Sequence, residues 1–415
     1  MHLCFYSLNE DGEKLASVIT ERTSGAASPD IVQAVAHGIK DAIQWMKTQG
    51  VKFIKGGSEG WRENTLAPPI VLKPGLHWEG RGGDVMLRTL TASFKAKGGT
   101  LMLGTRATKL DMQNGRCAGV HVEREGCTEI IPANNVVLCG GFQANLELLR
   151  KHITPAPEKL KQRGAATGNG DGMHMAREAG ARVTDLDRFY GHLLAREAME
   201  NPKLWPYPMI DHLAIAGIVV NSAGERFMDE GLGGVYMANC IAKLDDPWST
   251  AVIFDEAIWD GPARAFILPA NPNLVTAGAT ILRGESLQEL AGKLGVPAEK
   301  LQATVDAYNA AVKSGAIGSL QPARSSTAHE PLLLAKPPYY SIRLCPGITF
   351  TMGGIATDGN GRVMNEAGAP IPGLFAAGCT TGGLEGGPTA VYVGGLSKGA
   401  AMGFRIANHI AADVK

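Results

Sequence analysis

The chain has 415 residues, more than one compact core usually holds, so its length favours two interleaved domains. Forty basic side chains balance forty acidic ones, so the chain has no net positive charge that would attract it to nucleic acid or to an anionic membrane. This balance favours a small-molecule partner. The seven cysteines form no CxxC pair, so we predict no metal site. The opening segment lacks a signal-peptide pattern and no apolar run could span a bilayer, so we predict a cytoplasmic protein without a membrane span.

The first long helix is predicted over residues 28–50. Ser28 is a suitable N-cap, Pro29 fits the first turn, and Asp30 fits the positive end of the helix dipole. Apolar residues then recur at helical spacing until Gly50, which ends the helix. This stripe predicts a face packed in the core: Ile31, Val35, Ile39, Ile43 and Met46.

A second helix is predicted over residues 84–97 and a short strand over residues 100–103. The segment ATKLDMQNGRCAGVHVE then alternates on both sides of Asn114 and Gly115. An Asn-Gly pair between alternating runs is a strong hairpin signal, so we predict a small β-meander here.

Glycine is abundant, at 53 residues, and is clustered between apolar runs. The apolar run 136–138 is typical of a buried strand, and Cys139, Gly140 and Gly141 follow it directly. Glycines at a strand end allow the backbone to approach a ligand or another segment closely.

From about residue 187 to residue 340 the composition shifts to Pro, Trp and mixed helix and strand signals, which predicts a second domain. It contains a helical stretch over residues 286–314 with a break near Pro297. The last part of the chain is again rich in glycine and ends in a helix predicted over residues 396–411.

The stretch TMGGIATDGNGRVMNEAGAPIPGLFAAG, residues 351–378, closely resembles the C-terminal flavin-binding segment of the fumarate reductase and succinate dehydrogenase flavoprotein superfamily. Three further segments follow the order of that family: VVLCGGFQAN, GNGDGMHMAREAGARVTD and VVNSAGERFMDE. PGITFTMGG and NGDGMHMA are most similar to tricarballylate dehydrogenase-like members. The resemblance covers nearly the whole chain.

The resemblance implies an α/β fold, with a discontinuous FAD-binding domain of the glutathione-reductase type that is incomplete at the N-terminus. An inserted α+β capping domain would close on the substrate. The implied boundaries are residues 1–187 and 341–415 for the two parts of the FAD-binding domain and 188–340 for the capping domain. FAD is the implied cofactor.

By resemblance, the flavin ring would lie against glycine-lined backbone and the tip of the last helix. Reduction of the ring adds negative charge, which the N–H groups at a helix N-terminus can stabilise. Plain glycine turns are the alternative interpretation of the same residues. The implied cofactor-binding residues are Gly140, Gly141, Gly170, Asp171, Gly378, Cys379, Gly394, Gly395, Leu396 and Ser397.

Two features depart from the family pattern. The chain contains no G-x-G-x-x-G turn, which in relatives holds the pyrophosphate on a helix N-terminus. Cys379 stands where relatives carry an acidic residue, so a hydrogen bond worth ~1–2 kcal/mol would be missing unless Thr380 or Thr381 replaces it. We expect a reading frame that starts late, in preference to the alternative of a chain that binds flavin weakly or not at all.

Fumarate-handling relatives bind carboxylates with two histidines and two arginines, because dicarboxylates need cations with matching hydrogen-bond geometry. His192 matches the first histidine, whereas the expected arginines are absent and Phe350 replaces the second histidine. We expect catalytic roles for His192 and Tyr236, and no fumarate reduction by the family mechanism. Each candidate can instead simply pack, including the expected substrate contacts Thr349, Phe350, Glu385 and Tyr392.

The sequence therefore predicts a dehydrogenase or reductase that acts on a C–C bond next to a carboxylate or carbonyl, as tricarballylate dehydrogenase-like proteins do. Hydride would pass between the substrate and the flavin, with an unknown electron acceptor. Because the carboxylate-binding arginines and the second histidine of fumarate-handling relatives are absent, a ketosteroid dehydrogenase-like flavoprotein is one alternative. The missing turn and Cys379 leave a non-catalytic homologue without FAD as another.

Overall fold

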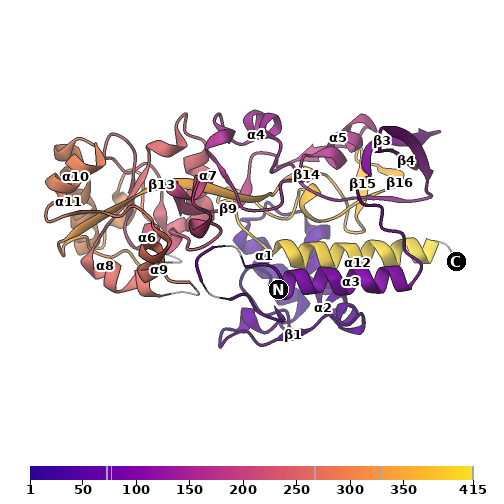
Figure 1. Ribbon diagram of the computed structural model, residues 1–415, viewed down its shortest axis with the longest axis horizontal. Helices are drawn as coiled ribbons and strands as arrows, with labels where there is room; N and C mark the ends of the chain where they lie inside the picture. Colours follow the sequence, from indigo (N-terminus) through magenta and orange to yellow (C-terminus); the bar gives the residue numbers. More distant parts are fainter. Residues whose placement is uncertain (72, 76, 266–267, 327–328, 414–415) are drawn as a thin grey trace.

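The computed structural model describes residues 1–71, 73–75, 77–265, 268–326 and 329–413. The molecule is elongated, and the 13-residue strand β13 (Tyr339–Thr351) runs from one lobe towards its centre (Figure 1). No helix among these residues combines the length and apolar character needed to cross a bilayer.

Four helices build the base of the second lobe: α1 (Gly12–Arg22), α2 (Pro29–Thr48), α3 (Gly82–Ala96) and α12 (Gly395–Asp413). All five residues of the predicted α2 stripe are buried, and all of them except Met46 belong to one cluster with Ala401, Met402 and Ile406 of α12. Ser28 occupies the N-cap position of α2, but its side chain makes no capping hydrogen bond, which corrects the role expected for it. The tip of α12 points towards the middle of the molecule (Figure 1).

The predicted meander is present as an antiparallel sheet of β3 (Arg106–Gln113), β4 (Arg116–Arg124) and β5 (Cys127–Pro132). Asn114 and Gly115 both have positive φ, at +50° and +76°, as this type of hairpin turn requires. The strand predicted over residues 100–103 is wrong, because these described residues pair with no strand and Leu103 is 76% exposed.

A second sheet holds β6 (Val136–Leu138), β16 (Pro370–Ala376) and β15 (Arg362–Met364), in the order β15-β16-β6. The buried strand predicted over residues 136–138 is therefore confirmed. It pairs in parallel with β16, more than two hundred residues later in the chain.

The mixed sheet of the other lobe is organised around β13. The first half of β13 pairs with β11 (Ala251–Asp255) and β12 (Leu282–Gly284), and β10 (Ile218–Val220) pairs with β11. The second half of β13 pairs with β7 (Lys161–Gln162) and β9 (Phe189–Ala195). The boundary at residue 340 thus falls inside a continuous strand, and the division into domains stays a prediction.

Helices surround this mixed sheet. The predicted helical stretch is present as α10 (Leu287–Leu294) and α11 (Ala298–Ser314), with the break at Gly295–Pro297. The other helices of this lobe are α6 (Asp211–Ala216), α7 (Gly234–Ala242), α8 (Glu256–Asp260) and α9 (Ala270–Ala277). The remaining elements are α4 (Leu146–His152), α5 (Asp171–Glu178), β1 (Phe53–Ile54), β2 (Thr65–Leu66), β8 (Val183–Thr184) and β14 (Gly354–Ile355).

Candidate active site

Two parallel strands bring predicted site glycines together. Leu138 of β6 lies opposite Ala376 of β16, so the carboxyl ends of both strands lie at one edge of the sheet. Gly140 and Gly141 follow β6, and a Cβ on Gly141 would lie 3.1 Å from the carbonyl oxygen of Cys379, which follows β16. The two strand ends are therefore side by side.

The backbone at these strand ends is open. Gly140 has φ +90° and Gly378 has φ +75°, a region that favours glycine, and a Cβ on either would meet no described atom within 4 Å. A Cβ on Gly399 of α12 would lie 4.0 Å from the Cα of Gly378. The open space is thus bordered by two strand ends and the first turns of α12, and we call it the glycine cradle.

A buried ion pair supports the turn that leads into α12. Glu385 accepts hydrogen bonds from the backbone N–H groups of Val393 and Gly394 at 3.2 and 3.1 Å. Its second carboxylate oxygen lies 3.7 Å from Nζ of Lys398, and the two side chains are 0% and 2% exposed. Lys398 also donates to the carbonyl of Thr381 at 2.8 Å. Glu385, for which a substrate contact is predicted, therefore lies beneath the turn.

The start of the chain forms a wall beside the same turn. The N–H of Cys4 donates to the carbonyl of Val393 at 2.7 Å. The ring centroid of His2 lies 5.7 Å from that of Tyr392, edge to face. The opening residues therefore fix one side of the cradle.

The first residues of α12 have different surroundings. A Cβ on Gly395 would lie 3.0 Å from the ring of Phe350, which is 8% exposed. Leu396 is 56% exposed, and Ser397 donates its hydroxyl hydrogen to the carbonyl of His2 at 2.8 Å. Gly395 thus packs against Phe350, whereas the hydroxyl of Ser397 bonds to the N-terminal wall.

Gly170 and Asp171 lie at the start of α5. Gly170 has φ +80°, and its N–H donates to the carbonyl of Gly141 at 3.0 Å, which places it at the edge of the cradle. Asp171 pairs with Arg106 of β3, with 2.9 Å between Oδ1 and Nη2. Its carboxylate is therefore bound to the neighbouring meander.

A chain of polar side chains lies next to the cradle. Oδ2 of Asp211 lies 2.5 Å from Nδ1 of His192, and Nε2 of His192 lies 2.9 Å from the hydroxyl of Tyr190. The ring of Tyr190 stacks on Tyr392, with centroids 4.1 Å apart. The structure thus gives His192 two partners, Tyr190 and Asp211, that the sequence analysis missed.

Arg163 is a buried cation beside this chain, and the sequence analysis also missed it. Its Nη1 donates to the hydroxyl of Thr349 at 2.7 Å, and its Nη2 donates to the carbonyl of Pro206 at 3.4 Å. Nε of Arg163 is buried without a hydrogen-bond partner among the described residues. Thr349, a predicted substrate contact, is therefore bonded to an internal arginine.

Tyr236 lies on α7, packed against the core of the lobe that carries β10 and β11. Its hydroxyl bonds to Cys240 one turn further along the helix, and burial raises its pKa above the usual value. The contacts of Tyr236 therefore lie within its own helix and lobe.

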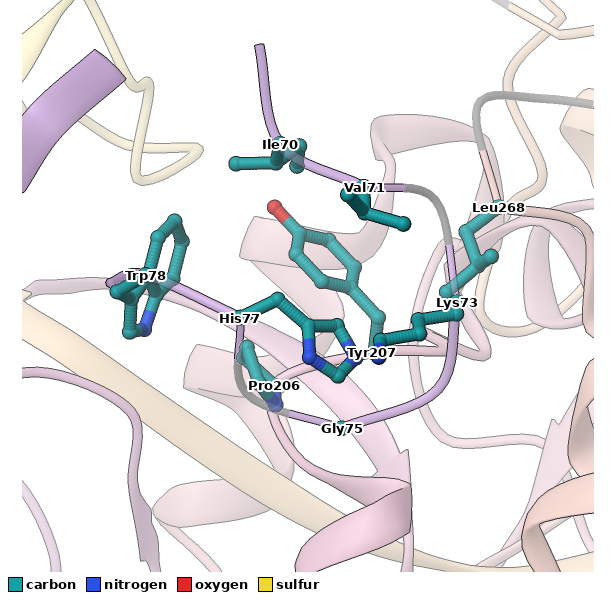
Figure 2. Close-up of a pocket in the computed structure, with 9 residues that line it drawn as sticks. All are labelled: Ile70, Val71, Lys73, Gly75, His77, Trp78, Pro206, Tyr207 and Leu268. Carbon is teal, nitrogen blue, oxygen red and sulfur yellow. The ribbon is translucent and has the colours of Figure 1, made fainter. Parts of the chain in front are cut away.

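A small hollow of about 20 Å³ adjoins Arg163 through Pro206 (Figure 2). Pro206, Tyr207 and Leu268 form one side, and the other is formed by Ile70, Val71, Lys73, Gly75, His77 and Trp78. Most of the lining is apolar, and Figure 2 shows the Tyr207 ring between Ile70, Val71 and His77.

The described residues fit the ring end of FAD. The cradle offers open backbone, and α12 directs its N-terminus there. Beside it, Oε1 of Gln143 and Oγ1 of Thr380 are buried without hydrogen-bond partners among the described residues, as expected next to ligand hydroxyls. Burial raises the pKa of Cys379 to about 11, so its thiol stays protonated and is a weak partner. The chain offers the phosphates no G-x-G-x-x-G turn.

The free energy of unfolding should fall as pH drops below neutrality. Burial lowers the pKa of several histidines, in His2 to about 4, so the folded protein keeps them neutral while the unfolded chain binds protons near pH ~6.5. Stability is then full above the unfolded pKa and lost below it. Urea midpoints at pH 7.5 and 5 test this, and equal midpoints would contradict it. The groups are His2, His152, His192, His212 and His329.

Comparisons with known proteins agree with this geometry. A sequence profile described as "FAD binding domain" matches residues 9–389. A probable fumarate reductase of Shewanella frigidimarina is 26% identical over 369 residues, which cover 86% of this chain and 57% of that protein. A 3-oxosteroid 1-dehydrogenase of Mycobacterium tuberculosis is 29% identical over 361 residues, or 79% of this chain and 63% of that protein. The chain spans about three fifths of the length of these two relatives.

Solved structures confirm the α/β fold predicted from the resemblance. The open conformation of a flavocytochrome c3 fumarate reductase superposes with a TM-score of 0.67 at 25% identity, covering 98% of this chain and 68% of the other. A 3-ketosteroid Δ1-dehydrogenase from Sterolibacterium denitrificans superposes with a TM-score of 0.73 at 19% identity, covering 99% and 90%. The second likeness is evidence for the fold alone.

Proposed function

The chain belongs to the FAD binding domain family, and from this membership we propose that it is an FAD-dependent oxidoreductase. It would remove or add hydrogen across a C–C bond next to a carbonyl or carboxylate. The observation that carries the proposal is the meeting of the glycine cradle, the tip of α12 and the Tyr190–Tyr392 stack at one place.

FAD, when bound, supplies a ring that accepts or returns hydride. Gly140 and Gly378 would hold that ring, because a Cβ at either meets no described atom within 4 Å, whereas Gly394 and Gly395 are packed against the carbonyl of His2 and the ring of Phe350. The N-terminus of α12 would stabilise negative charge on the reduced ring through its N–H groups and dipole. Glu385 and Lys398 would keep the turn in place rather than contact substrate.

The surroundings of the Tyr190–Tyr392 stack favour a neutral carbonyl compound with an apolar body. Burial raises the pKa of both phenols well above the usual value, so both stay protonated and uncharged, and the Tyr392 hydroxyl can donate to a carbonyl oxygen. Two hydrogen-bond donors of Arg163 already serve Thr349 and Pro206, so this cation is poorly placed to bind carboxylates. A cyclic ketone such as a 3-oxosteroid is therefore favoured over a tricarballylate-like acid.

Bleaching of bound flavin separates these substrate classes. The chain is reconstituted with FAD, freed of excess flavin and mixed without oxygen with 4-androstene-3,17-dione or with tricarballylate. We expect the steroid to bleach the visible flavin band and tricarballylate to leave it unchanged.

Bleaching by tricarballylate alone would overturn the ketone assignment and restore the tricarballylate dehydrogenase-like reading. A protein that retains no FAD would contradict the whole proposal and favour a non-catalytic homologue.

A further inference from the structure

Strand geometry fixes Tyr190 and His192 as a pair. They are two residues apart on β9, so their side chains leave the same face of the sheet. Both are held by pairing with β13, where Tyr190 lies opposite Phe350 and His192 opposite Gly347. The pair is therefore part of a sheet rather than of a loop.

Asp211, at the start of α6, is held against His192 by backbone contacts. Its Oδ1 accepts the N–H of Leu193 at 2.8 Å, and the N–H of Ile210 donates to the carbonyl of Leu193 at 2.8 Å. The side chains of His192 and Asp211 are only 13% and 11% exposed. The carboxylate thus has a fixed direction towards the imidazole.

The charges in this chain set the position of the imidazole proton. Burial alone would raise the pKa of Asp211, but the facing His192 and the hydrogen bonds to the carboxylate hold that pKa below its usual value. Burial also lowers the pKa of His192, so the ring is neutral near pH 7. An ionised Asp211 accepts from Nδ1–H, which leaves Nε2 free to accept the hydroxyl hydrogen of Tyr190.

The other end of the chain reaches the cradle. Tyr190 stacks on Tyr392 at an interplanar angle of 23°, and Tyr392 is two residues before Gly394 in the turn that leads into α12. The ring of Phe350 also lies beside Tyr190, with 5.2 Å between the two ring centroids. Tyr190 therefore contacts His192 through its hydroxyl and the rings of Tyr392 and Phe350 through its own ring.

We propose that Tyr190 is the catalytic residue that exchanges the proton with substrate carbon, and that His192 and Asp211 form its proton relay. In the dehydrogenation direction the substrate C–H proton passes to the Tyr190 oxygen while the Tyr190 hydroxyl hydrogen passes to Nε2 of His192. The electron pair of that C–H bond would become the new C=C bond, and FAD, when bound, would supply the hydride acceptor for the adjacent carbon. Asp211 stabilises the imidazolium. Reduction is the reverse, and the assignment rests on the proposed function.

Tyr190→Phe removes the transferable proton and keeps the ring stack. We expect it to lower the rate of flavin reduction by 4-androstene-3,17-dione about 10²–10⁴-fold, with FAD affinity unchanged. Tyr339→Phe is the matched control, because Tyr339 is a partly buried tyrosine at the start of β13, far along that strand from the end that pairs with Tyr190. Its flavin should be reduced by the steroid at the wild-type rate. A Tyr190→Phe rate within threefold of this control would overturn the proposal.

The position of the His192 proton is a readout that needs no turnover. Nitrogen NMR of the cofactor-free chain should find the proton on Nδ1. Asp211→Asn should move it to Nε2, because an amide that turns its oxygen away presents its NH2 group to Nδ1, which then accepts a hydrogen bond. A wild-type proton on Nε2 would overturn the relay. A chain whose flavin is bleached by neither substrate would sink the proposed function instead, while the NMR result would still decide the relay.

Discussion

Glu385→Gln is expected to lower the free energy of unfolding by about 3–5 kcal/mol. The substitution keeps an oxygen that can accept from Val393 and Gly394, so it removes mainly the charge. Lys398, 2% exposed, would then be an uncompensated cation in the interior. Urea unfolding at neutral pH measures the loss.

Two further variants isolate the charge effect. Glu289→Gln is the surface control, because its pair with Lys293 has side chains that are 44% and 47% exposed, and such pairs contribute only about 0–1 kcal/mol. Adding Lys398→Met to Glu385→Gln should recover much of the lost stability, since no charge is left buried. If Glu385→Gln were as mild as Glu289→Gln, the buried pair would not support the turn.

Gly378→Ala is expected to weaken FAD binding roughly a hundredfold, or about 2.8 kcal/mol. The new methyl group would project into the open space of the cradle, where a Cβ meets no described atom within 4 Å. Equilibrium titration of the apoprotein with FAD, followed by flavin fluorescence, measures the change in dissociation constant.

Gly368→Ala controls for backbone strain. Gly368 has φ +77°, close to the +75° of Gly378, and is equally open, but it lies in the exposed turn between β15 and β16. Both alanines should cost about 1–2 kcal/mol of stability, because an alanine is strained in the left-handed region. Equal losses of FAD affinity in the two variants would show that the cradle does not hold the flavin.

Local sequence signals predicted much of the fold. Asn114 and Gly115 marked their hairpin, the apolar stripe marked α2, and Pro297 marked the break between α10 and α11. Each signal depends on residues within one turn or one hairpin. The strand predicted over residues 100–103 failed, because strand propensity has effect only where a partner strand is present.

The site was predicted in part. Glycines after apolar runs marked the two strand ends that border the cradle, because each strand and its glycines are adjacent in sequence, and their contact with flavin stays a prediction. Tyr190 could have been predicted from the alternation of side chains along a strand, because residues two apart lie on the same face and Tyr190 is two residues before His192. Arg163 meets Thr349 186 positions away, and Glu385 meets Lys398 only because a turn folds back, so no local pattern announces either contact. Such pairs require the three-dimensional fold.

The central claim is that the flavin ring occupies the glycine cradle at the tip of α12. A crystal structure of the chain with FAD bound tests it most directly. The account predicts ring density between Gly140, Gly378 and the first turn of α12, within reach of Tyr190. Ring density elsewhere, or a cradle that stays filled by protein while FAD binds at another place, would contradict it.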